Sequence, residues 1–345
     1  MTRMEIAGKK IGEGSPVYII AEIGNMHDGS LGQAKALIKT AAECGVDAVK
    51  TQTHDGEAET LPDAPFPPWF NPGETRIGYY NRIAFSKEQY EELIRFAQGL
   101  GVTLLSSPFS IKSVDLLESV GMQAYKIPSG EVTHLPYIDH IARLKKPVFL
   151  SSGMSNWEEL DTAVETIRRH HDQIVLMQCT SEYPCSYERV GLNVLKEMRD
   201  RYRLPAGLSD HTEACFMPIA AAAMGACAVE KHFTLSKKMF GPDAPFSMEP
   251  DELKHMVQGI RAVGTALSHL VSKNDLSSLK QVKQVFEKSI VAAADLPEGL
   301  TVTTEHLTCK KPGGGLPPKI FSRLVGRKLR RPVKHNERVK MEDFA

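Results

Sequence analysis

The sequence has no excess of charge of either sign and no long hydrophobic run. Lysine plus arginine and aspartate plus glutamate both number 42 in 345 residues. No global electric field therefore draws the chain to nucleic acid or to a membrane surface, and any anion-binding site must be local. No stretch approaches 18 uninterrupted apolar residues, so we expect no membrane-spanning helix. The start, MTRMEIAGKKIGEG, lacks the apolar centre of a signal peptide.

Paired cysteines are also missing. The six cysteines form no CxxC pair and do not suggest a disulfide framework, so we expect a reducing, cytoplasmic location. Apolar residues at 42% and charged residues at 24% are typical of a globular protein. At 345 residues, one large domain plus a small one is the expected organisation.

What the chain does have is a regular alternation of buried-strand and amphipathic-helix patterns through about residue 270. Eight such pairs predict an α/β fold of the (β/α)8, or TIM-barrel, type. A doubly wound sheet is the alternative, but no GxGxxG motif opens a helix. The expected strands cover 17–24, 48–53, 102–108, 124–129, 147–153, 173–179, 206–209 and 228–231.

Two stretches break this regularity. The segment 53–86 is long, with a proline-rich, aromatic middle, and long barrel loops are usually lids or binding elements. After the expected barrel domain, 1–270, a polar linker is expected over 271–285. Short strands and turns rich in glycine and proline then predict a small β-rich domain over 286–345.

Two histidines follow neighbouring strands. His211 and His232 each stand at the carboxyl end of a short apolar run, and such ends carry the active sites of parallel α/β folds. Two imidazoles form a partial shell for a divalent metal, with open positions for substrate. The alternative is that both are structural histidines.

Other strand ends carry lysines, serines and a glutamate. Lys50 and Lys126 beside several serines indicate an anion site, although solvated lysines are the alternative. Glu22 is either a general base or a residue that orients a ligand. Strand alternation places Glu230 on the face of His232, and it places Asp210 and Lys231 on the opposite face. These residues indicate a metal-assisted barrel enzyme acting on an anionic, phosphorylated substrate.

Nine motifs in order along the chain resemble the sialic acid synthase family. They are AEIGNMHDG (21–29), DAVKTQTH (47–54), LSSPFS (105–110), AYKIPSGE (124–131), LSSGM (150–154), CTSEYP (179–184), GLSDHT (207–212), EKHFT (230–234) and CKKPGGG (309–315). The last is similar to the start of that family's antifreeze-like (SAF) domain. The resemblance implies a synthase of nonulosonic (sialic-type) acids, which condenses phosphoenolpyruvate with N-acetylmannosamine or a related acetamido sugar and releases phosphate by C–O cleavage.

The resemblance also implies roles for individual residues. His211 and His232 would hold Mn²⁺ or Mg²⁺, and Glu22 would be the active-site carboxylate. The implied phosphoenolpyruvate contacts are Lys50, Ser107, Lys126, Ser129, Ser151, Ser181 and Ser209. The implied sugar contacts are Gln52, Tyr183, Asp243 and Lys311.

Three positions depart from the family pattern. Met26 precedes His27 where the family often has asparagine, Ser181 replaces an asparagine of some members, and Lys311 stands where the family has arginine. The family further implies a homodimer in which each small domain lies over the partner's strand ends. Two other functions stay open, namely another synthase of 3-deoxy keto acids that uses phosphoenolpyruvate, or a non-catalytic, spore-coat-type sugar-phosphate binder.

Overall fold

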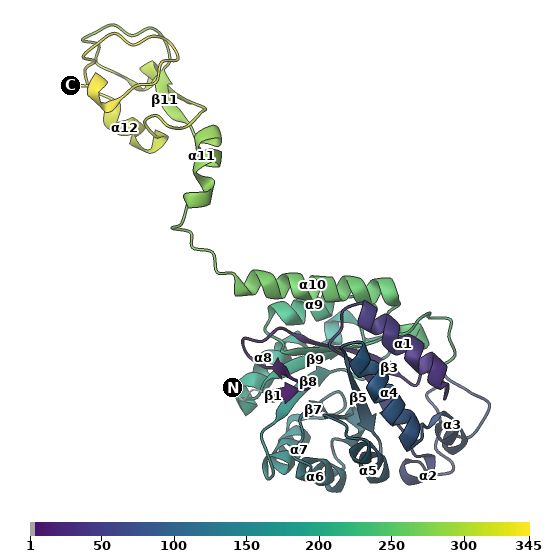
Figure 1. Ribbon diagram of the computed structural model, residues 1–345. Helices are drawn as coiled ribbons and strands as arrows, with labels where there is room; N and C mark the ends of the chain where they lie inside the picture. Colours follow the sequence, from purple (N-terminus) through teal and green to yellow (C-terminus); the bar gives the residue numbers. More distant parts are fainter. Residues whose placement is uncertain (1–3) are drawn as a thin grey trace. The chain divides into compact units, whose positions relative to one another are not determined.

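Eight parallel strands close into a barrel, which confirms the predicted fold (Figure 1). The structure is a computed structural model that describes residues 4–345. The strand order is β10-β3-β4-β5-β6-β7-β8-β9, so the last strand along the chain pairs with the first and leaves no open edge. The strands are β3 (Tyr18–Gly24), β4 (Ala48–Thr53), β5 (Thr103–Pro108), β6 (Tyr125–Ile127), β7 (Val148–Ser151), β8 (Ile174–Cys179), β9 (Ala206–Asp210) and β10 (Ala228–His232).

One long helix follows each barrel strand and packs outside it. In α1 the buried residues Ala34, Leu37, Ile38 and Ala41 recur at helical spacing, and Ser30 caps the first turn through Gln33 N–H. The helices α4 and α7 begin with reciprocal capping boxes. The eight helices are α1 (Leu31–Glu43), α4 (Lys87–Gly99), α5 (Ile111–Ser119), α6 (Leu135–Arg143), α7 (Trp157–Arg168), α8 (Leu192–Tyr202), α9 (Phe216–Ala223) and α10 (Pro250–Ser268).

A short hairpin closes the amino end of the barrel. It consists of β1 (Met4–Ile6) and β2 (Lys9–Ile11), paired antiparallel. Met4, Ile6 and Ile11 are buried in one cluster with the inward-facing residues of the barrel, among them Phe149 and Met177. The sequence interpretation did not anticipate this hairpin, because three-residue strands in a charged stretch carry almost no periodic signal.

The long segment 53–86 is ordered around two short helices, α2 (Gly56–Glu59) and α3 (Arg76–Ile83). Phe70, Tyr79, Tyr80 and Ile83 form a separate buried cluster with Phe66 against it. The segment therefore carries a small core of its own, which supports its interpretation as a binding element.

A second compact unit begins at Leu270, directly after the barrel unit ends at His269. It contains η4 (Ser277–Leu279), α11 (Lys280–Phe286), β11 (Ser289–Ala292), η5 (Thr304–His306), β12 (Leu307–Lys310), η6 (Pro318–Ile320), α12 (Phe321–Leu324) and η7 (Met341–Asp343). Its core is small, and Ile290, Leu307 and Leu329 are among its buried residues. The expected linker 271–285 is thus partly helical.

Three further 3₁₀ turns lie in barrel loops: η1 (Ser129–Glu131), η2 (Tyr187–Arg189) and η3 (Ala244–Phe246). Over residues 4–345, no helix is long and apolar enough to cross a membrane.

Candidate active site

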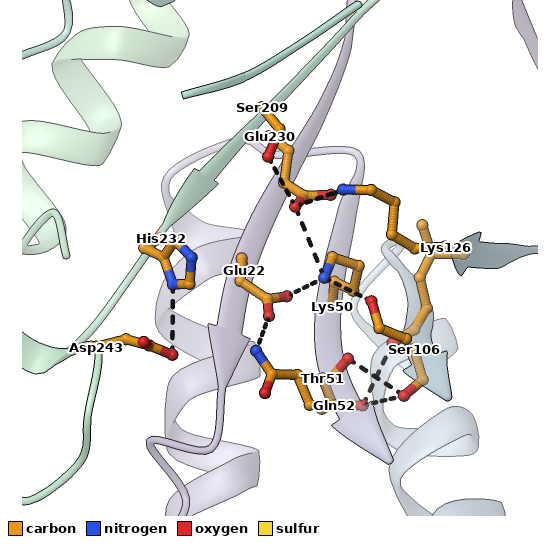
Figure 2. A network of polar contacts seen from close by, with 12 residues as sticks. Glu22, Lys50, Thr51, Gln52, Ser106, Lys126, Ser209, Glu230, His232 and Asp243 are labelled. Atoms are coloured by element: carbon orange, nitrogen blue, oxygen red, sulfur yellow. Dashed lines mark hydrogen bonds and ion pairs between the residues drawn. The ribbon is translucent and has the colours of Figure 1, made fainter. Parts of the chain in front are cut away.

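Two lysines and two glutamates meet inside the carboxyl end of the barrel (Figure 2). Lys50 Nζ lies 2.7 Å from Glu22 Oε2 and 3.7 Å from Glu230 Oε1, and it donates to Ser107 Oγ at 3.0 Å. Lys126 Nζ donates to both carboxylate oxygens of Glu230 at 2.9 Å. The four charged side chains come from four different strands, and all are buried.

The surroundings shift the pKa values of three of these side chains. Burial disfavours the charge on Lys50, but Glu22 and Glu230 outweigh it and raise the pKa of the ammonium. Burial would also raise the pKa of Glu230, yet Lys126 and Lys50 lower it to about 2. For Glu22, burial prevails over Lys50, and its pKa is raised. Of the two carboxyl groups, Glu22 is therefore the one that takes up a proton more readily.

A group of uncharged donors lies beside the charged set. Ser129 Oγ donates to Ser151 Oγ at 3.0 Å and accepts from Gly153 N–H at 3.1 Å. A Cβ on Gly153 would lie 2.5 Å from Ser181 Oγ and 2.7 Å from Ser129 Oγ, so any side chain here would displace these hydroxyl groups. We name Ser129, Ser151, Ser181 and the Gly153 N–H the serine cradle. Convergent hydroxyl and amide donors next to two ammonium groups suit the oxygens of a phosphate.

The two histidines of the sequence prediction lie side by side, with ring centres 5.4 Å apart. His211 Nδ1 lies 2.8 Å from the carbonyl oxygen of Thr180, so Nδ1 carries a proton and Nε2 has a lone pair in the neutral ring. Burial disfavours the charged ring, but Cys179 and the Thr180 carbonyl outweigh burial and raise the pKa of His211, so coordination by Nε2 would have to displace a proton. His232 Nδ1 is buried without a hydrogen-bond partner, and its distance of 3.7 Å from Asp243 Oδ2 is too long for one.

These histidines fit half of a metal shell. Burial first, and then the neighbouring His211, lower the pKa of His232 well below its usual range, which keeps a lone pair available for coordination. No group of three histidine, cysteine, aspartate or glutamate side chains in the described part of the chain is arranged to hold a metal. Substrate and water would complete the shell around an ion held by His211 and His232.

Asp243 and Gln52 converge on the backbone of Gly24. A Cβ there would lie 3.0 Å from Asp243 Oδ2 and 3.4 Å from Gln52 Nε2, and Gly24 has φ +47°. The register of the β3–β4 pairing also shifts between Glu22 and Gly24. The side chain of Asp243 is 19% exposed, and its partial burial, followed by the nearby Glu22, raises its pKa to about 6.

Aromatic rings form one wall of the site. The Tyr183 ring lies 4.2 Å from that of His211 and 6.3 Å from that of Phe246, between centres. Trp69, from the segment 53–86, contacts Tyr183 at 6.2 Å and Phe246 at 5.9 Å. Trp69 is 51% exposed, so one face of its ring is free. We name Trp69, Tyr183 and Phe246 the aromatic wall.

Thirteen of the fourteen residues singled out from the sequence thus lie in the barrel unit. Ser209 joins them through a hydrogen bond of 3.2 Å to Glu230 Oε1. Lys311 belongs to the second unit, where its Nζ lies 5.1 Å from the centre of the Phe286 ring. Asp210 and Lys231 pair with each other at 2.6 Å, away from the charged set, as strand alternation predicts.

Sequence reasoning did not assign a role to several residues of the site. Glu230 was placed beside His232 but not recognised as the shared partner of both lysines. Cys179 lies 3.9 Å from His211 Nδ1, and although burial alone would raise the pKa of its thiol, His211 brings it to about 7. Gly153 was also missed, although a glycine after two strand-end serines is a signal for close backbone approach.

Two family models match this chain. The NeuB family model matches residues 37–272, and the SAF domain model matches residues 287–345. The chain is 37% identical over 330 residues to N,N'-diacetyllegionaminic acid synthase from Legionella pneumophila, covering 93% of this chain and 92% of that protein.

Two solved structures are also similar. The N-acetylneuraminic acid synthetase from Leptospira borgpetersenii, in complex with citrate, has a TM-score of 0.71 at 26% identity, covering 82% of this chain and 95% of that one. A spore coat polysaccharide biosynthesis protein from Bacillus subtilis has a TM-score of 0.69 at 31% identity, covering 100% and 99%.

Proposed function

The chain belongs to the NeuB family, and from this membership we propose that it is an enzyme that condenses phosphoenolpyruvate with an acetamido sugar to give a nonulosonic acid. The observation that carries the proposal is the buried set of Lys50, Lys126, Glu22 and Glu230 beside the serine cradle and the two histidines. Buried ionic groups are costly to a fold, and their concentration at the functional end of a barrel supports a catalytic role.

Phosphoenolpyruvate carries a carboxylate and a phosphate, and the site offers two kinds of anion partner. Lys50 and Lys126 are the charged donors, and Ser107 and Ser209 lie within hydrogen-bond distance of this set. The serine cradle offers neutral donors to phosphate oxygens without adding charge. On binding, the anionic substrate would compete with Glu22 and Glu230 for the two ammonium groups.

The reaction forms one C–C bond and breaks one C–O bond. C3 of phosphoenolpyruvate attacks the aldehyde carbon of the sugar, water adds to C2, and phosphate leaves with the electrons of the C2–O bond. Glu22 would accept the proton of the water, because its raised pKa makes it the better base of the two glutamates. Glu230 stays ionised and holds both lysines in position.

A divalent ion, Mn²⁺ or Mg²⁺, held by His211 and His232 would supply Lewis-acid polarisation of the sugar aldehyde. Tyr183 and Asp243 lie beside the histidine pair, Gln52 lies with Asp243 at Gly24, and all three would contact the sugar. The metal proposal is tested by Mn²⁺ binding, followed by electron paramagnetic resonance, in the wild type and in His211→Ala/His232→Ala. If both proteins bind Mn²⁺ equally, the metal site lies elsewhere. If the wild type binds none, the metal proposal is wrong.

The acceptor is proposed to be one of three sugars: N-acetylmannosamine or the diacetamido-trideoxy hexoses that lead to legionaminic and pseudaminic acids. The similarity to the Legionella enzyme favours a diacetamido sugar. Assaying the purified protein with phosphoenolpyruvate, Mn²⁺ and each sugar tests the function. Phosphate release that depends on one of these sugars supports it. Release with none of them, but with a phosphorylated aldose, would support the other class of 3-deoxy keto acid synthase.

We further propose a homodimer in which Lys311 of one chain reaches the sugar site of the other. Supporting it, α11 and the turn before it expose Leu276, Leu279, Val282, Val285 and Phe286, a row of apolar side chains typical of an interface. A lysine retains the charge of the family's arginine but not its two-pronged hydrogen bonding.

The six cysteines are all free, which supports a reducing compartment such as the cytoplasm.

The dimer arrangement is tested by mixing Glu22→Ala and Lys311→Ala proteins under conditions that allow subunit exchange. A mixed dimer would contain one doubly defective site and one intact site, so activity should partly return. If Lys311→Ala is inactive by itself and the exchanged mixture stays at background, each small domain does not serve its partner's barrel.

A further inference from the structure

A chain of hydrogen bonds leads from Glu22 to the helix α2. Gln52 Nε2 donates to Glu22 Oε1 at 3.0 Å, as Figure 2 shows. Gln52 Oε1 accepts from Asn25 Nδ2 at 3.1 Å, and that same Asn25 nitrogen lies 3.3 Å from His54 Nε2. At the far end, His54 Nδ1 lies 2.7 Å from Glu59 Oε1. The chain thus joins the proposed base to a residue of the segment 53–86.

Glu59, at one end of this series of hydrogen bonds, determines which group donates and which accepts in the bonds that follow. A carboxylate only accepts, so in the neutral ring of His54 the proton lies on Nδ1, facing Glu59, and Nε2 accepts from Asn25 Nδ2. Nε2 also lies 3.2 Å from Gln52 Oε1, a contact between two acceptors that Asn25 Nδ2 bridges by donating to both. Asn25 then donates one N–H to His54 and the other to Gln52 Oε1. The Gln52 amide can therefore offer only its NH2 group to Glu22. A flipped Gln52 would set its carbonyl oxygen against the Glu22 carboxylate and its NH2 against that of Asn25.

The imidazole of His54 is held firmly in the orientation that this chain requires. Its ring is stacked between Tyr80, at 3.9 Å and 4°, and Phe109, at 4.4 Å and 19°. The Glu59 side chain is only 6% exposed, and its Oε2 accepts from the backbone N–H of Asp55 at 3.3 Å. The helix α2 has only four residues, yet Glu59 at its end is buried and makes hydrogen bonds both to His54 and to the backbone.

The helix that carries Glu59 is itself fixed against α3. A Cβ on Gly56 would lie 2.7 Å from the carbonyl oxygen of Ile77, so α2 and α3 approach at a distance that only glycine allows. Gly56 N–H also donates to Asn81 Oδ1 at 3.0 Å. The position of Glu59 is therefore set by the folded core of the segment 53–86, through α3.

We propose that His54 and Glu59 are positioning residues for Glu22, which act through Asn25 and Gln52. In this role they act on Glu22 through other side chains and not on a reacting atom. Their effect is to fix which way the Gln52 amide points and thereby the orientation and basicity of the Glu22 carboxylate. This inference rests on the proposed role of Glu22, and it makes the folding of the segment 53–86 a condition for chemistry as well as for substrate enclosure.

The test compares three variants of α2. Glu59→Leu removes the acceptor, Glu59→Gln retains a carbonyl oxygen for His54, and Glu57→Leu changes an exposed glutamate on the same helix. Glu59→Leu should lower kcat about tenfold or more, the size typical of a lost orienting contact, while KM for phosphoenolpyruvate stays within about twofold. Glu59→Gln should recover most of the loss, and Glu57→Leu should behave as wild type.

A second variant keeps the test valid if Glu59→Leu folds poorly. His54→Phe preserves the stacking between Tyr80 and Phe109 but removes the hydrogen bonds. It should lower kcat as Glu59→Leu does, and the double variant should lose little more, because both changes break the same chain. Additive losses, or a loss confined to the melting temperature with kcat intact, would overturn the proposal.

Side-chain ¹⁵N spectra of histidine-labelled protein separate this inference from the proposed function. The wild type should show His54 protonated at Nδ1, identified by the signals that disappear in His54→Phe, and Glu59→Leu should change that tautomer. A wild-type protein with the proton on Nε2 would contradict the proposed series of hydrogen bonds, whatever its activity. A tautomer that changes while kcat does not overturns the positioning role, and an inactive wild type with the expected tautomer overturns only the proposed function.

Discussion

The two ends of the barrel are built from the same eight strands but have opposite contents. At the amino end the β1–β2 hairpin buries Met4, Ile6 and Ile11 against the inward-facing apolar residues. At the carboxyl end the strands finish in charged and hydroxyl side chains that are also buried, and the lysines and glutamates among them pair with one another while His232 Nδ1 has no partner. The amino end gains stability from its burial, while the carboxyl end accepts a desolvation cost that only function explains.

The first prediction concerns the proposed base and carries the largest expected effect. Glu22→Gln keeps the size of the side chain but cannot accept a proton, so kcat should fall by about 10²–10⁴-fold, the range for losing a general base. The melting temperature should stay close to that of the wild type. Activity within tenfold of wild type, measured as phosphate release, would remove Glu22 from the chemistry.

A complementary change at the amino end should affect stability alone. Ile6 is buried under the barrel, and Ile6→Ala should lower the free energy of unfolding by about 2–5 kcal/mol, as large-to-small core changes do. Below the melting transition its kcat/KM should match the wild type. Leu267→Ala, at a position that is 56% exposed, is the control and should change neither quantity. Loss of turnover in fully folded Ile6→Ala would contradict the claim that the amino end of the barrel contributes to stability and not to catalysis.

Lys126 sharpens the comparison because its loss affects both binding and stability. Lys126→Met should raise KM for phosphoenolpyruvate about tenfold or more, since hydrogen bonds to charged groups contribute about 1.5–3 kcal/mol. It also leaves Glu230 buried with one lysine fewer, which lowers stability. Lys126→Met/Glu230→Gln should recover stability but not affinity. Recovery of both would show that the lysine serves the fold and not the substrate.

Trp69 should show the smallest effect. Removing its ring takes away one exposed face of the aromatic wall, and such contacts contribute about 0.5–1.5 kcal/mol. Trp69→Ala should therefore reduce kcat/KM for the sugar by about three- to tenfold, with Trp69→Phe in between and KM for phosphoenolpyruvate unchanged. An equal effect on both substrates would indicate a general loosening of the segment 53–86. Phe216→Ala, another exposed aromatic, is the matched control.

Most of the barrel could be predicted from the sequence because its signals are local. Buried strands such as 173–179 and one-sided helices such as α1 carry strong periodicity, and strand alternation correctly separated Glu230 from Lys231. The clustering of strand-end residues follows from the parallel topology itself, so the sequence predicts that Lys50 and Lys126 lie at the same end of the barrel.

The rest depends on contacts between residues far apart in sequence. Glu230 and Lys126 are 104 residues apart, and no pattern in either strand announces the pair. The hairpin β1–β2 is too short to show periodicity, and it is stable only because the barrel covers it. The chain from Glu59 to Glu22 depends on a four-residue helix in a proline-rich stretch that sequence reasoning treated as a loop.

The central claim is that the carboxyl end of the barrel performs a C–C condensation with loss of phosphate by C–O cleavage. The most direct measurement uses phosphoenolpyruvate labelled with ¹⁸O in the oxygen that bridges C2 and phosphorus, incubated with the enzyme, Mn²⁺ and the acceptor sugar. The account predicts that the label leaves with the inorganic phosphate, because water supplies the new oxygen at C2. Label retained in the keto acid product would mean P–O cleavage and would contradict the account.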